Sequence, residues 1–147
     1  GTTSATVPLV AVGNVPAGAG PPKFLNAEFN WIRINGMEAK NEDRIEVQRG
    51  APVFVEASVG NTQEALWLAP GNDGGQGTVW LKARPAGSPE NFILAPIAAD
   101  TGFLSDALVV ETQLLPALDR QTEFVFRMTA LGRADFGEVR RVVLVPR

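Results

Sequence analysis

The chain has 147 residues, with 13 Lys and Arg against 16 Asp and Glu, a net charge of −3, and neither Cys nor His. The missing Cys and His exclude disulfides, thiolate and imidazole metal sites, and the Ser-His-Asp and Cys-His arrangements of nucleophilic catalysis. At this length roughly 70% of the unfolded surface can be buried, so we expect one domain with a hydrophobic core of its own.

Charge and hydropathy also narrow the expected partners. The basic residues form no block, so we expect no nucleic-acid partner. The apolar runs are far shorter than the roughly 20 residues that span a bilayer, so we expect no membrane span. The residues from Gly1 onward lack the basic start and apolar middle of an export signal. If Gly1 is the remnant of a removed tag, an export signal or a neighbouring domain was trimmed with it.

The first 22 residues are expected to be an arm or a linker. Val7–Val12 is a short apolar strand candidate, and Pro8, which lacks an amide donor, confines it to a sheet edge or a docked arm. Gly13–Pro22 is rich in Gly, Pro and Ala and is typical of a linker. Two readings stay open for this linker, a loop within one domain or a connection between domains. We therefore assign residues 1–22 to the arm or linker and residues 23–147 to the globular domain.

Phe24–Ile34 alternates as a strand, but its polar side switches part-way along. Such a switch is typical of a strand that bends between two sheets or carries a β-bulge. Asn35-Gly36 follows directly and is the strongest short hairpin signal in the chain, because both residues accept a left-handed backbone. The next strand candidate begins after the charged loop Lys40–Asp43.

Ile45–Leu68 predicts two strands joined by a turn at Arg49-Gly50. In the second strand every other residue is apolar, which is the period of a strand with one buried face: Val53, Val55, Ala57 and Val59. Gly60-Asn61-Thr62 is expected to form the turn after this strand, since Gly and Asn accept the backbone of a reversal.

Five further strand candidates follow, separated by Gly-, Pro- and Asn-rich loops: Thr78–Ala83, Phe92–Ile97, Ala107–Leu115, Thr122–Ala130 and Val139–Val145. In the fourth, the side chains of Phe124, Phe126 and Met128 share one side and are expected in the core. The last two candidates predict a hairpin through residues 131–138, with Gly132 and Gly137 as turn residues. The spacing of these strands, without a helical period, predicts an all-β antiparallel sandwich of about 7–9 strands.

The segment Ile45–Asn61, a strand, a Gly turn and a strand that ends in VGNT, resembles the immunoglobulin-like accessory modules of secreted bacterial polysaccharide-degrading enzymes. The resemblance implies an immunoglobulin-like sandwich that is secreted or on the cell surface. It implies a non-catalytic, structural or positioning role within a larger glycoside hydrolase. The implied partner is the catalytic domain of that enzyme or a polysaccharide, and the alternative role is a carbohydrate-binding module.

The acidic residues suggest little chemistry. The loop Asn72–Gly75 has the look of a calcium loop, but a hard cation needs more carboxylates than one Asp, unless Asp100 or Asp106 completes the site. Paired carboxylates could make a glycosidase, but most acids lie beside turn residues, where they cap backbone amides. We therefore expect no catalytic residues, no metal site, no cofactor and no enzymatic activity.

The three tryptophans are more informative. Trp67 is expected in the core, as sandwiches often bury one Trp between their sheets. Strand parity places Trp31 outward beside Arg33, and Trp80 outward beside Lys82. We expect these four residues to contact a ligand or an interface, because sugars stack on flat aromatic rings and exposed aromatics mark contact surfaces. The alternative is that the arm or long loops cover them, and the absence of Tyr favours the structural role.

Overall fold

The computed structural model describes residues 24–71, 76–88, 92–113 and 118–147, with only the backbone at 110–113. The expected strand Val7–Val12, the expected linker Gly13–Pro22 and the calcium-like loop Asn72–Gly75 lie outside the described residues. Among the described residues no helix could cross a membrane.

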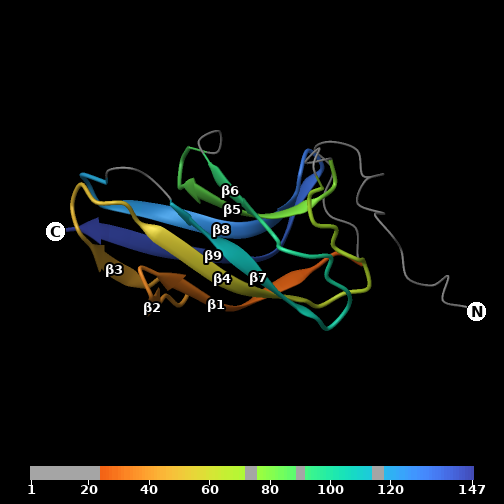
Figure 1. Ribbon diagram of the computed structural model, residues 1–147. Coiled ribbons are helices and arrows are strands. Elements are labelled where there is room, and N and C mark those ends of the chain that lie inside the picture. The colour runs from red at the N-terminus through yellow and green to blue at the C-terminus, as the bar shows by residue number, and fades with distance from the viewer. Residues whose placement is uncertain (1–23, 72–75, 89–91, 114–117) are drawn as a thin grey trace, which may run out of the picture.

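The described chain is all-β and forms two stacked sheets, a β-sandwich (Figure 1). Its strands are β1 Ala27–Ile34, β2 Met37–Glu38, β3 Arg44–Val47, β4 Phe54–Asn61, β5 Val79–Pro85, β6 Ile93–Pro96, β7 Asp106–Gln113, β8 Thr122–Ala130 and β9 Ala134–Pro146. One sheet has the order β2-β1-β4-β7 and the other the order β3-β9-β8-β5-β6. The predicted sandwich is confirmed, and the nine described strands fall within the predicted number.

One strand pair departs from the antiparallel prediction. β3 runs parallel to β9, with Arg44 opposite Val143 and Val47 opposite Pro146. The reason lies in the turn at Arg49-Gly50, where Gly50 has a φ of 75°. This turn does join β3 to β4, but it carries the chain from one sheet to the other rather than forming a hairpin within one sheet. β3 is thereby left beside the last strand instead of beside β4.

The core lies between the sheets and is filled by the alternating residues of facing strands. The apolar side of β4, from Val53 to Val59, is fully buried as predicted. On β8, Phe124, Phe126 and Met128 are buried as predicted. Trp67 is also buried, and its ring packs edge-on against Phe136 of β9 with 5.6 Å between ring centroids. Burying large aromatic side chains of this kind is the main favourable term that holds the two sheets together.

The switch of polarity in β1 is a β-bulge, as expected. Phe29 pairs with Val59 and Trp31 pairs with Ser58, so Asn30 is an extra residue on the β1 side. Before the bulge the odd-numbered side chains, Ala27 and Phe29, are buried, and after it the even-numbered ones, Ile32 and Ile34, are buried. The Asn35-Gly36 turn then reverses the chain into β2 with φ values of 49° and 83°, which confirms the predicted hairpin. The bulge is what turns Trp31 and Arg33 outward.

Gly137 is not a turn residue, in contrast to the prediction. The β8–β9 turn comprises only residues 131–133, with Gly132 at a φ of 72°, whereas Gly137 lies inside β9 at a φ of 81°. The pairing of β8 with β9 is irregular at this point, between the pairs Phe126–Arg140 and Met128–Phe136. A Cβ on Gly137 would lie 2.7 Å from the Cβ of Ala27, so glycine is required by the close approach of β1.

Asn61 is not a turn residue either. It ends β4 and is 1% exposed. Its side-chain Nδ2 donates to the carbonyl oxygens of Ala65 at 2.8 Å and Thr101 at 2.9 Å, and its Oδ1 accepts from the N–H of Gln63 at 3.2 Å. Instead of forming a turn, the Asn61 side chain closes a buried junction between two loops through these bonds.

Candidate functional site

Trp31 and Arg33 lie on the outer face of the four-stranded sheet, where parity predicted them. The guanidinium carbon of Arg33 lies 3.8 Å from the centroid of the Trp31 ring, which is a close cation–π contact. Arg33 also pairs with Glu56 of the neighbouring strand, with 3.8 Å between Nη1 and Oε1. Trp31 is partly exposed, and the guanidinium of Arg33 covers one face of its ring.

Trp80 and Lys82 lie on the outer face of the five-stranded sheet, again where parity predicted them. Val79 and Leu81 on either side of Trp80 are buried, and Trp80 is half-buried. The indole Nε1 donates a 3.0 Å hydrogen bond to Oγ1 of Thr78. The ammonium of Lys82 bonds the carboxylate of Asp135 on β9, with the closest Nζ–O distance 3.2 Å.

The structure does not bring the two tryptophans together. Trp31 belongs to β1 and Trp80 to β5, and these strands are in different sheets. The outer faces of the two sheets point away from each other (Figure 1). The four predicted contact residues therefore divide into two pairs on opposite sides of the molecule, and each side has to be considered by itself.

On the four-stranded sheet, a row of outward residues crosses β1, β4 and β7. The register places Trp31 opposite Ser58 and Ser58 opposite Leu108, so the small Ser58 lies between two large apolar side chains. Phe54 stands further along β4 on the same side. Leu108 is 56% exposed and Phe54 is 42% exposed. We call Trp31, Phe54, Ser58 and Leu108 the apolar row.

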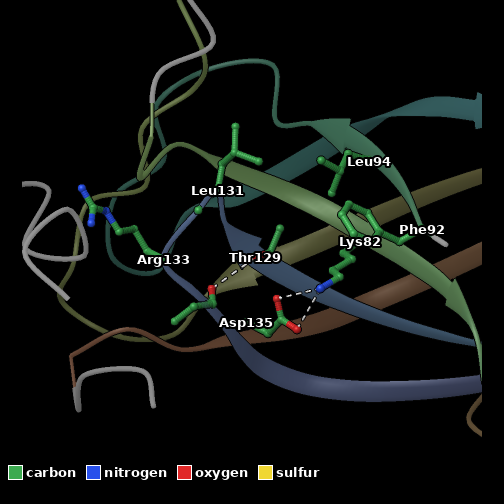
Figure 2. A pocket seen from close by; sticks show the side chains of 9 residues that line it. Lys82, Phe92, Leu94, Thr129, Leu131, Arg133 and Asp135 are labelled. Carbon is green, nitrogen blue, oxygen red and sulfur yellow. Dashed lines mark hydrogen bonds and ion pairs between the residues drawn. The ribbon is translucent and has the colours of Figure 1, made fainter. Parts of the chain in front are cut away.

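On the five-stranded sheet, a surface pocket of about 410 Å³ opens beside Lys82 (Figure 2). Its apolar walls are Phe92, Leu94 and Leu131, and the ion pair of Lys82 with Asp135 crosses its floor. The Lys82 ammonium lies 4.7 Å from the centroid of the Phe92 ring. The pocket thus combines apolar surface with a cation and a carboxylate, from strands and a turn that are far apart in the sequence.

A second pocket of about 190 Å³ shares Lys82 and Asp135 with the first. Its other charged residues are arginines from three adjacent strands: Arg84 on β5, Arg127 on β8 and Arg141 on β9. The register places Arg84 and Arg141 on either side of Val125. We call the two adjoining pockets the five-stranded groove.

Of the residues that line this groove, the sequence predicted only Lys82. The alternation along β5 and β8 could have marked Arg84 and Arg127 as outward, because each follows the same parity as its neighbours. It could not show that both arginines line one pocket with Arg141 and Asp135, since this arrangement depends on strand order and register. Phe92 directly precedes β6, and no sequence pattern predicts that its side chain lines a pocket.

No metal site emerges from the described residues, among which no group of three or more potential ligands is close enough to hold an ion. The carboxylate of Asp100 instead accepts a 2.8 Å hydrogen bond from the N–H of Ala69. Asp106 pairs with Gly60 in the sheet.

Comparison of the chain with protein-family models and with curated proteins finds no match.

Proposed function

We propose that the chain is a non-catalytic accessory module of a larger secreted enzyme that degrades polysaccharide, and that it positions the catalytic domain of that enzyme. The observation that carries this proposal is the apolar row on the four-stranded sheet. The solvent face of an antiparallel sheet is normally polar, whereas here Phe54 and Leu108 are exposed on it, beside the partly exposed Trp31 that Arg33 overlies. The neighbouring catalytic domain is the proposed occupant of this row.

The strand order supports an immunoglobulin-like topology for the module. In the immunoglobulin arrangement, strands B and E belong to one sheet and strands C, F and G to the other. β4 and β7 would take the places of B and E, and β5, β8 and β9 those of C, F and G. In this correspondence β1 would be the first strand, and β3 would be an additional edge strand beside the last one. Trp67 is buried as in many sandwiches, but it precedes β5, the strand that would take the place of C, so it does not mark that strand.

The direct test uses the full reading frame that contains this chain. We expect it to encode a polysaccharide-degrading catalytic domain, and we expect the two domains of the full protein to unfold in one coupled calorimetric transition. Leu108→Asn together with Phe54→Asn should separate this transition into two. Leu104→Asn is the matched control, because Leu104 is 78% exposed at a turn outside the apolar row. A reading frame without such a domain, or two independent transitions in the unmodified protein, would contradict the proposal.

A second candidate function is carbohydrate binding on the opposite side of the molecule. It is favoured by the five-stranded groove, which combines the Phe92 ring with Lys82 and Asp135. The half-buried Trp80 lies on the same face of the sheet, opposite Thr129 of the groove. Sugar sites commonly combine a flat apolar surface with polar groups that bind hydroxyls. Soluble oligosaccharides should then shift the tryptophan fluorescence of the isolated chain, and Trp80→Ala should remove the shift while the chain stays folded. If no oligosaccharide produces a shift, this candidate fails and the positioning role is unaffected.

A further inference from the structure

We propose that the five-stranded groove binds a polysaccharide that carries carboxylates, that is, a chain of uronic acids. The inference rests on the second candidate function above and names the class of glycan that it would take. Three features support it: the local excess of positive charge, guanidinium groups whose donors are not all used by the described residues, and the apolar pocket beside them.

The charge of the groove is opposite to that of the whole molecule. The chain has a net charge of −3. The second pocket of the groove nevertheless contains Lys82, Arg84, Arg127 and Arg141 against the single carboxylate of Asp135. Glu123 of β8 adds a second carboxylate beside the pocket, paired with Arg141, so four basic residues stand against two acidic ones there. A concave surface of one sign raises the local concentration of ligands of the other sign.

Within the described part of the chain, the arginines of the groove have donors that no other residue uses. Among the residues that the structure describes, the Arg84 side chain makes no ion pair or hydrogen bond. Arg127 donates from Nε to the carbonyl oxygen of Gly137 at 3.2 Å, which leaves its terminal nitrogens without a partner in the same part of the chain. Arg141 is held more loosely, by an exposed pair with Glu123 at 3.6 Å. A guanidinium fork matches a carboxylate geometrically and can bind it through two parallel hydrogen bonds.

The adjoining pocket favours a sugar over an acidic peptide. A uronic acid presents a carboxylate, hydroxyl groups and an apolar C–H face on one rigid ring. With the carboxylate at Arg84 and Arg127, the chain would continue toward the pocket walled by Leu94 and Leu131, because the two pockets share Lys82 and Asp135. The ammonium of Lys82 and the carboxylate of Asp135 lie where the two pockets meet, and they are suited to donate to and accept from hydroxyls.

The test measures binding of polygalacturonate oligomers to the isolated 147-residue chain by calorimetry. The matched ligand control is the same oligomer with its carboxyls methyl-esterified. We expect the acid form to bind, the binding to weaken as salt is raised, and the ester to bind at least about 10-fold more weakly, the ratio expected for loss of a charge-assisted hydrogen bond.

Variants locate the site. Arg84→Gln and Arg127→Gln should each weaken binding of the acid form about 10-fold. Arg84→Lys keeps the charge but loses the planar fork, so its affinity should lie between those of the parent and Arg84→Gln. Arg147→Gln removes the same charge at an exposed position outside the groove and should change affinity less than about 2-fold. Unchanged thermal unfolding of each variant shows that the loss is not due to misfolding.

Other results overturn the inference in distinguishable ways. Equal binding of the acid and the ester would mean that the carboxylates are not recognised, while the carbohydrate-binding candidate would stand. Equal binding of polyglutamate and polygalacturonate would mean that the groove binds any polyanion and not a sugar chain. Binding of the acid form that survives both Gln substitutions would place the site elsewhere. Absence of binding by both sugars would remove the inference.

Discussion

The carboxylate of Glu138 on β9 accepts a 2.8 Å hydrogen bond from the backbone N–H of Phe29 on β1, across the two sheets. Both residues lie at irregularities, Phe29 beside the bulge of β1 and Glu138 where the β8–β9 pairing shifts. Arg140 completes the contact, since its guanidinium pairs with Glu138 at 2.9 Å and lies 5.4 Å from the centroid of the Phe29 ring. A backbone donor released by one bulge is thus satisfied by a side chain from the other, as buried donors must be.

Glu138→Ala should destabilise the chain by about 1–3 kcal/mol, because it leaves the Phe29 N–H without an acceptor in a part-buried site. Urea unfolding measures this loss. Glu138→Gln keeps an acceptor oxygen and should lose less. Glu46→Ala is the control, since Glu46 is exposed and its removal should cost about 0.5 kcal/mol or less. A loss for Glu138→Ala as small as that of the control would show that the bond does not contribute.

Gly137→Ala should be more destabilising than Gly36→Ala, although both glycines have a positive φ, 81° and 83°. At Gly36 nothing lies within 4 Å of an added Cβ, so only the left-handed backbone costs energy, about 1–2 kcal/mol. At Gly137 the added atom would also lie 2.7 Å from the Cβ of Ala27 and 2.8 Å from its backbone N and O. Equal losses in thermal unfolding would mean that β1 can move away at no cost.

Asn61→Ala should cost about 1–3 kcal/mol, because the carbonyl oxygen of Ala65 loses its buried donor, whereas that of Thr101 still accepts from the N–H of Trp67. Asn30→Ala is the matched control, since its amide makes an exposed bond to Ser58. Its loss should stay near 0.5 kcal/mol. Chemical denaturation of the two variants side by side measures the difference, and a similar loss in both would show that water replaces the Asn61 amide.

Phe126→Ala should cost about 3–5 kcal/mol, the penalty for emptying a fully buried aromatic site. Phe103→Ala removes the same side chain where it is 53% exposed, and its loss should be about 1 kcal/mol or less. Equilibrium unfolding provides both values. A loss below 1 kcal/mol for Phe126→Ala would be incompatible with the core as described.

The parts of the fold that the sequence predicted well are those that depend on one strand at a time. The period of two places Phe126 inward and Trp80 outward because each strand has its own two faces. The same reasoning found the bulge in β1, since a change of parity within one strand leaves a direct trace in the sequence.

The parts that it missed depend on contacts between distant segments. The sequence around Gly137 is typical of a turn. Only the close approach of Ala27 shows why a glycine is required there, inside β9. Arg84 and Arg141 share a groove because both flank Val125 in register, and neither segment by itself contains that information. For the same reason, parity along each strand cannot show that Trp31 and Trp80 belong to different sheets.

The parallel pairing of β3 with β9 determines when the molecule can be completed during synthesis. β3 leaves the ribosome about 100 residues before its partner residues, Val143–Pro146. Until then β3 cannot join its sheet, and β8 also lacks its partner β9. The emerging chain therefore carries unpaired strand edges until β9 has been made, a condition that exposes it to aggregation and delays the packing of this sheet.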